Sequence, residues 1–145
     1  MGVFKEDAQM ATREEESARW RAISRDRRKA AQRLLKAECY RSSISRSYYA
    51  AYAAITGALV AQGIPFSQRR GGPSHAGLPT YILNNLSALP QTMRFDINKA
   101  IRRLYTSRVE ADCVIATLSD RSVAVNSLRD LRSVLLLLGT DQERS

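Results

Sequence analysis

The chain has 145 residues, of which 44% are hydrophobic and 26% charged, so it is long enough for one globular domain with a single core. Its 23 lysines and arginines outnumber 14 acidic residues and give a formal charge of +9, which favours nucleic acid as partner, then an acidic protein or membrane surface. A single histidine excludes two-histidine metal sites, and the sequence contains neither a phosphate-binding glycine motif nor a nucleophile elbow.

Few breaking residues interrupt the chain, which holds only 7 glycines and 4 prolines, and β-branched alternation is scarce. This composition predicts an all-α protein. We expect it in the cytoplasm, because the first ten residues lack an apolar core, the run at 134–138 is too short to span a bilayer, and two cysteines without metal spacing suit a reducing compartment. We expect neither a metal nor a cofactor.

The first predicted helix covers residues 5–37, and its modest apolar stripe consists of Trp20, Ile23, Ala30, Leu34 and Ala37. The stripe is thin before about residue 17. We therefore expect an N-terminal arm or helix extension at 1–18, a helical bundle at 19–139 and a disordered tail at 140–145. Candidate phosphate-binding residues on this helix are Arg25, Arg28 and Lys29, although a charged face on an amphipathic helix is also explained by solvation alone.

A central, largely buried helix is predicted at residues 43–60, starting at an N-cap serine, Ser42 or Ser43, and ending at Gly63. Its large apolar residues recur every three or four positions and are separated by small ones: Ile44, Tyr48, Tyr52, Ile55 and Leu59. The first turns also carry polar and aromatic side chains. Either these cap the helix and pack at its edge, or this end of the helix belongs to a functional site.

The longest irregular stretch, residues 66–79, is basic and glycine-rich and carries His75, with Arg69 and Arg70 as further phosphate-binding candidates. A histidine can move the proton of an RNA 2′-hydroxyl while an arginine stabilises the charge that develops on phosphate. Four residues separate Arg70 from His75, so the pair fits this chemistry; chance spacing and simple anion binding are the alternatives. A short third helix is predicted at 80–89.

Helical spacing returns at residues 92–118, where Arg108 and Asp112 interrupt an apolar face four positions apart. They are either a structural ion pair, buried or at a subunit seam, or residues of a site. The last helix, at 121–138, has a bundle-type seam and ends at Gly139.

Three motifs resemble those of the HEPN domain, in particular its short prokaryotic branch often encoded beside minimal nucleotidyltransferases. Residues 45–52, SRSYYAAY, are similar to the "sRxYYAaf" signature of that branch. Residues 75–78, HAGL, resemble "H-x-G-hydrophobic", and residues 104–112, LYTSRVEAD, resemble "LyxxRxxAD". Motif order and spacing agree from about residue 30 to residue 138.

The resemblance implies an up-and-down antiparallel bundle of four to five helices, usually a homodimer, whose motif residues face a shared cleft. It implies Arg108, His75 and Arg46 as catalytic candidates, with the cleft lined by Ser45, Tyr48, Tyr49, Tyr52 and Asp112. Active HEPN ribonucleases carry Arg-x4–6-His on a late helix; here Cys113 stands where the histidine could fall, and none follows.

Three functions therefore remain open. The first is an RNA-binding and RNA-cleaving protein of a toxin–antitoxin or defence module, acting as a homodimer with a nucleotidyltransferase partner. The second is a non-catalytic helical module that positions the substrate of that partner. A plain RNA-binding dimer using the arginine-rich first helix is a third, and its binding would be steeply salt-dependent.

Overall fold

The computed structural model describes residues 2–67, 71–113 and 120–139, and all regular structure in these ranges is helical. The helices are α1 (Gly2–Lys36), α2 (Tyr40–Ala61), α3 (Leu78–Asn85), α4 (Gln91–Cys113) and α5 (Arg121–Leu138). The predicted all-α bundle is confirmed. Among the described residues, none of these helices is long and apolar enough to span a membrane.

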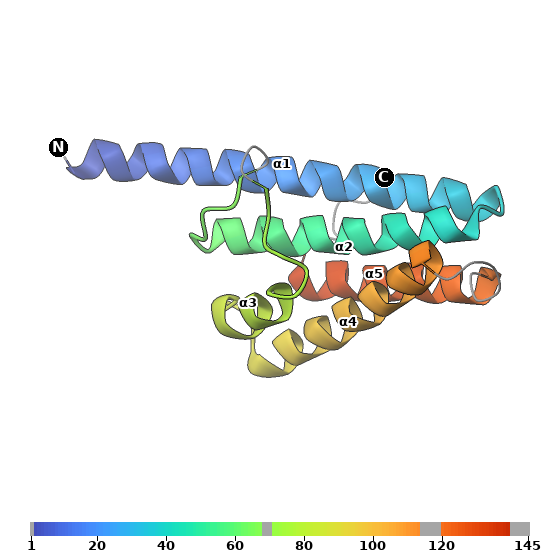
Figure 1. The fold of residues 1–145 in the computed structure, drawn as a ribbon. Coiled ribbons are helices and arrows are strands. Elements are labelled where there is room, and N and C mark those ends of the chain that lie inside the picture. The colour runs from blue at the N-terminus through green and yellow to red at the C-terminus, as the bar shows by residue number, and fades with distance from the viewer. Residues whose placement is uncertain (1, 68–70, 114–119, 140–145) are drawn as a thin grey trace.

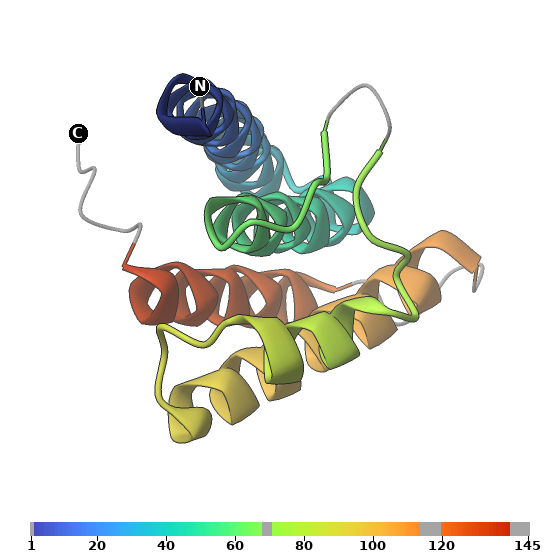
Figure 2. The same cartoon turned by 90° about the vertical axis from the view of Figure 1, so that its left-hand side faces the viewer.

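Helix α2 lies at the centre of the bundle and contacts each of the other four helices. Figure 1 shows α1 antiparallel to α2 along the whole length of α2, with the first turns of α1 projecting past its end. Figure 2 shows α5 beneath the α1–α2 pair and α3 and α4 on its other side, and α4 crosses obliquely so that it packs on α2 as well as on α5. Successive long helices alternate in direction, as in an up-and-down bundle.

Three buried serines fix the register of α1 against α2. Their hydroxyls donate to backbone carbonyls of the opposite helix at 2.7–2.8 Å: Ser17 to Gly57, Ser24 to Ala50, and Ser43 to Ala31. We call these six residues the serine seam. Along each helix its members are seven residues apart, which is the heptad spacing of a coiled coil. The backbones approach so closely that a Cβ atom added to Gly57 would lie 3.2 Å from the carbonyl oxygen of Ser17.

The predicted apolar stripe of α1 is only partly right. Trp20 is buried, whereas Ala37 is exposed. Ser17, Ser24 and Ala31 bury their side chains instead. A serine can replace an apolar residue in a helix interface because its hydroxyl is satisfied by the facing carbonyl, and a search for apolar periodicity does not detect such a position.

The predicted start of α2 is wrong, and its predicted end is confirmed. The helix begins at Tyr40, and Ser43 lies inside it with its hydroxyl committed to α1 rather than to capping. At the other end Gly63 has a φ of +104°. Its N–H donates to the carbonyl of Val60, and the N–H of Ile64 donates to that of Leu59, which satisfies carbonyls that the helix end would leave free.

The main core surrounds α2, as the predicted central helix requires. Its large, fully buried side chains come from all four helices other than α1, namely Tyr48, Ile55, Leu59, Leu78, Ile82, Ile97, Leu104, Leu131 and Val134. Helix α3 is shorter than the predicted 80–89, because it ends at Asn85. The predicted end of the fourth helix and the predicted tail lie among residues 114–119 and 140–145, outside the described residues, and the division into arm, bundle and tail stays a prediction.

We predict that the serine seam is sensitive to both polarity and size. Ser24→Ala removes one buried hydrogen bond and should lower the free energy of unfolding by about 1 kcal/mol. Ser24→Val also forces an extra methyl group between two close backbones and should cost about 1–3 kcal/mol more. Urea unfolding followed by circular dichroism measures both, with the exposed Ser42→Ala as the control; equal stability of all three variants would contradict the seam.

Candidate functional site

Four tyrosine rings from α2 and α4 form one aromatic group, which we call the tyrosine cluster: Tyr48, Tyr49, Tyr52 and Tyr105. Tyr48 is its centre, with ring centroids 5.3 Å from Tyr49, 6.3 Å from Tyr52 and 5.6 Å from Tyr105. Tyr48 and Tyr52 are one helical turn apart on α2, so they share a face. Tyr48 is 1% exposed and Tyr105 is 40% exposed, so the cluster leads from the core to the surface.

His75 lies against this cluster, although it belongs to the loop between α2 and α3. Its Nδ1 atom is 2.5 Å from the hydroxyl oxygen of Tyr48, and its ring centroid lies 5.3–6.1 Å from those of all four tyrosines. Burial lowers the pKa of His75, and the positive charge of Arg108 lowers it further. The imidazole is therefore neutral at pH 7, the form that can accept a proton.

The loop that carries His75 is anchored to α1 and α2. Trp20 Nε1 donates to the carbonyl of Phe66 at 3.4 Å, and the hydroxyl of Tyr52 donates to the carbonyl of Pro73 at 2.6 Å. Gly72 packs directly on Tyr52, and an added Cβ atom would overlap its hydroxyl oxygen. These contacts on both sides of residues 68–70 fix where the imidazole meets the cluster.

Arg108 of α4 approaches the same rings. Its guanidinium carbon lies 5.0 Å from the ring centroid of Tyr49, 5.5 Å from Tyr48 and 5.9 Å from Tyr105, within cation–π range. Its Nε donates to a carboxylate oxygen of Asp112 at 3.2 Å. The terminal amino groups, with four of the five N–H donors, are what the guanidinium can offer to an anion.

The Arg108–Asp112 pair is real but not buried, since the two side chains are 21% and 41% exposed. An exposed ion pair one helical turn apart contributes only about 0.3–0.5 kcal/mol. The pair thus orients the guanidinium over the rings more than it stabilises the fold.

The hydrogen bond between Tyr48 and His75 can run in either direction, because a phenol and an imidazole nitrogen each donate or accept. Burial raises the pKa of Tyr48 above its usual value of 10, and it does the same for Tyr52. Both phenols stay protonated at neutral pH. When Nδ1–H donates to Tyr48, the lone pair of His75 lies on Nε2.

An open cleft of about 450 Å³ lies beside the tyrosine cluster, between the first turns of α2 and the last turns of α4. Its lining residues are Arg41, Ser42, Ser45, Arg46, Tyr49, Ala111 and Asp112. Arg41 Nε donates to the carbonyl of Ala111 at 2.7 Å and so ties the two helices together at this place. Tyr49 belongs both to the cleft and to the cluster.

The structure brings most of the sequence-predicted site residues together. His75, Arg108 and Asp112 meet at the predicted tyrosines Tyr48, Tyr49 and Tyr52, and Ser45 and Arg46 line the adjacent cleft. The lining of the cleft does not include the predicted basic residues of α1, namely Arg25, Arg28 and Lys29. Arg69 and Arg70 lie outside the described residues.

Sequence reasoning did not name Arg41, Tyr105 or Gly72 as site residues, although Tyr105 belongs to the third HEPN-like motif. Tyr105 precedes Arg108 by three residues, so helical spacing alone places both on one face of α4. Arg41 belongs to the helix only because α2 begins earlier than predicted. No local signal marks Gly72, because its tight packing depends on a tyrosine twenty residues away.

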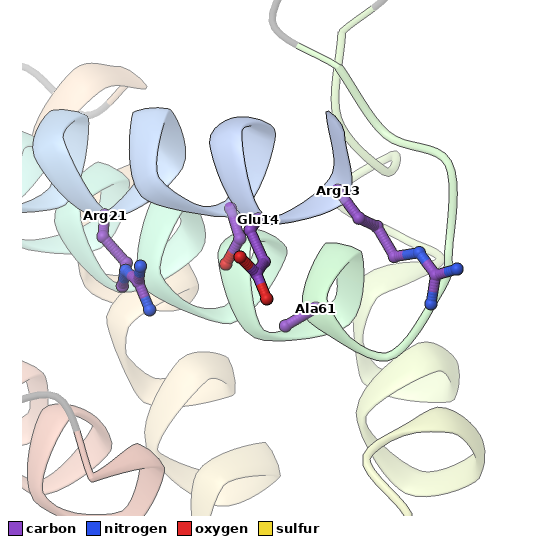
Figure 3. Close-up of a pocket in the computed structure, with 5 residues that line it drawn as sticks. Arg13, Glu14, Arg21 and Ala61 are labelled. Carbon is purple, nitrogen blue, oxygen red and sulfur yellow. The ribbon is translucent and has the colours of Figure 1, made fainter. Parts of the chain in front are cut away.

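A second cavity, of about 380 Å³, lies between α1 and α2 near the other end of α2 and is lined by Arg13, Glu14, Ser17, Arg21 and Ala61. Figure 3 shows Glu14 between the two arginines. The lining therefore mixes both signs of charge, and none of the four tyrosines of the cluster is among the lining residues.

The sequence model of the HEPN domain matches residues 17–140, which is most of the chain. The chain belongs to the HEPN family. The comparison with curated proteins finds no match. The HEPN match ends one residue beyond Gly139, where α5 terminates, and begins at Ser17, the first member of the serine seam. The serine seam, the tyrosine cluster and the cleft all lie inside the HEPN match.

In the parts of this HEPN chain that the structure describes, no three histidine, cysteine or carboxylate side chains gather as metal ligands would. The side chain of Cys113 is not among those described, and Cys39 is an exposed free thiol. The chemistry that the arrangement offers is that of one neutral imidazole beside one guanidinium.

We predict that Gly72 is required for the loop position. Gly72→Ala places a methyl group on the hydroxyl of Tyr52 and should lower the free energy of unfolding by about 1–3 kcal/mol. In a Tyr52→Phe background the nearest clashing atom is absent, so the same substitution should cost clearly less. Urea unfolding of the wild type, the two single variants and the double variant gives the coupling free energy between Gly72 and Tyr52. If the two substitutions have additive effects on the free energy of unfolding, the packing described is contradicted.

We predict a stability change with pH that comes from His75. Its pKa is lower in the folded than in the unfolded protein, so the unfolded state binds more protons below pH 6.5. The melting temperature should therefore fall as the pH drops through and below 6.5, and His75→Gln should reduce that fall. Since the chain has one histidine, no other imidazole contributes. If the melting temperatures of the wild type and of His75→Gln fall equally between pH 7.5 and pH 5.5, the lowered pKa of His75 is contradicted.

Proposed function

We propose that this HEPN-family protein binds RNA and cleaves it without a metal ion, with His75 as general base and Arg108 as the group that stabilises charge on phosphate. The observation that carries the proposal is that both residues, from separate parts of the chain, contact the same three rings, Tyr48, Tyr49 and Tyr105. A formal charge of +9 supports a polyanionic substrate.

In the proposed reaction, Nε2 of His75 takes the proton of a ribose 2′-hydroxyl while Nδ1–H donates to Tyr48. The 2′-oxygen attacks the adjacent phosphorus, and the bond to the 5′-oxygen of the next nucleotide breaks. Arg108 neutralises the charge that develops on the non-bridging oxygens. The products are a 2′,3′-cyclic phosphate and a 5′-hydroxyl, whose oxygen takes a proton from water as it leaves. The imidazolium of His75 then releases its proton to solvent.

The lowered pKa of His75 supports this role. A general base must be unprotonated at working pH, and both burial and the charge of Arg108 favour the neutral imidazole. Arg108 also retains its terminal N–H groups for phosphate, because the contact with Asp112 uses Nε. The late-helix histidine typical of active HEPN ribonucleases is absent, and we assign its part to His75 of the preceding loop.

We further propose that the protein works in the cytoplasm as a homodimer within a toxin–antitoxin or defence module, with a nucleotidyltransferase-type partner. Support comes from the motif resemblance, and HEPN domains often dimerise. Tyr105 of the tyrosine cluster is 40% exposed and Phe95, also on α4, is 45% exposed, so α4 presents large side chains that a second copy could cover.

A second candidate is a non-catalytic module that positions the substrate of such a partner. The observation that favours it is that the polar groups of the cluster are already paired within the chain: Arg108 with Asp112, and His75 with Tyr48. The absence of a histidine after Arg108 on the late helix also favours the non-catalytic module. In this case the arginines hold a ligand, and no bond is broken.

Cleavage of a single-stranded RNA pool in EDTA separates the two. We expect wild-type protein to produce 2′,3′-cyclic phosphate ends, His75→Gln to reduce the rate by about 10²–10⁴-fold, and Arg108→Gln by about 10²–10³-fold. The control is Arg132→Gln, an exposed cation of α5 outside the site. Each variant is first shown to keep its melting behaviour and oligomeric state. If the folded wild-type protein does not cleave the RNA, the nuclease proposal is wrong and the non-catalytic module that positions a partner's substrate is favoured.

A further inference from the structure

The cleft beside the tyrosine cluster has no part in the chemistry proposed above. It holds about 450 Å³, lies against the cluster through Tyr49, and is formed by α2 residues 41–49 together with Ala111 and Asp112 of α4. Two arginines and two serines line it. Its lining is thus rich in hydrogen-bond donors.

The cleft has an excess of positive charge. Arg41 and Arg46 contribute two cations, and Asp112 is the one acid among the lining residues. That carboxylate is already paired with Arg108 at 3.2 Å, so it does not cancel the charge of the cleft. Arg41 Nε donates to the carbonyl of Ala111. This hydrogen bond holds the guanidinium in place and leaves its terminal N–H groups for a ligand.

Tyr49 connects the cleft to the proposed catalytic pair. One side chain lines the cleft and also lies 5.0 Å from the guanidinium of Arg108 and 6.1 Å from the imidazole of His75, by ring centroid. Tyr49 is therefore shared between the cleft that Arg41 and Arg46 line and the group of rings that Arg108 approaches. Successive phosphates with bases that stack on aromatic rings are what a single nucleic-acid strand presents.

We propose that this cleft is a phosphate subsite for the nucleotide next to the scissile phosphodiester, with Arg46 and Arg41 as its cations. The ligand of the protein is then a single-stranded RNA with at least two successive phosphates, one at Arg108 and its neighbour in the cleft. This inference rests on the proposed RNA function and extends it. Arg46 binds the flanking phosphate and takes no part in proton transfer.

Binding of a 12-nucleotide 2′-O-methyl RNA tests the subsite apart from the chemistry, because this RNA has no free 2′-hydroxyl and cannot be cleaved. Fluorescence anisotropy between 50 and 200 mM NaCl gives the slope of log affinity against log salt. We expect Arg46→Gln to make that slope shallower by roughly 0.7, the contribution of one phosphate contact on a single strand. We expect Arg46→Lys to keep the slope, because it keeps the charge.

The matched control is Arg132→Gln, which removes another exposed arginine, from α5 outside the cleft, and should change neither slope nor affinity. Equal losses in Arg46→Gln and Arg132→Gln would overturn the subsite, because they would report only net charge. Failure of the folded wild-type protein to bind this RNA would overturn it as well. Binding that depends on Arg46, without cleavage of ordinary RNA, would support the subsite and contradict the nuclease. Cleavage of ordinary RNA, without binding that depends on Arg46, would support the nuclease and contradict the subsite.

Discussion

The close antiparallel contact between α1 and α2 is the constraint on which the rest of the bundle depends. The six residues of the serine seam form it, three on each helix at a spacing of seven positions. Three serine hydroxyls donate to carbonyls across the contact. A slip by one residue would break these bonds and turn other side chains toward the interface. The seam therefore fixes how α2 is rotated, and with it which face of α2 is offered to α4 and α5.

The rotation of α2 in turn places the tyrosine cluster. Tyr48 faces the core and Tyr49 its edge, so α4 meets both when it packs on α2. Tyr52 lies on the side of Trp20, with ring centroids 6.2 Å apart, and binds the loop that carries His75. Helix α2 thus positions a histidine from the loop at its C-terminal end and an arginine from α4.

Burial then sets the protonation of the groups that meet there. The tyrosine rings displace water from His75 and bring it near Arg108, and both effects lower the pKa of the imidazole. The same rings attract the guanidinium, so the two polar groups are held by one hydrophobic surface. A neutral base beside a fixed cation, next to a cationic cleft, is an arrangement suited to RNA.

The sequence by itself determined the all-α class, the central helix with its stop at Gly63, the pairing of Arg108 with Asp112, and the motif residues that meet at the site. The helical class, the stop at Gly63 and the ion pair follow from composition, from spacing along one helix or from local turn chemistry, and the motif residues follow from the resemblance to HEPN motifs. Only the tertiary structure decided that His75 lies on Tyr48, that Arg41 closes the cleft, and that serines of α1 belong to its buried face. Each of these depends on a partner from another element, and apolar periodicity carries no information about which distant group will satisfy a polar one.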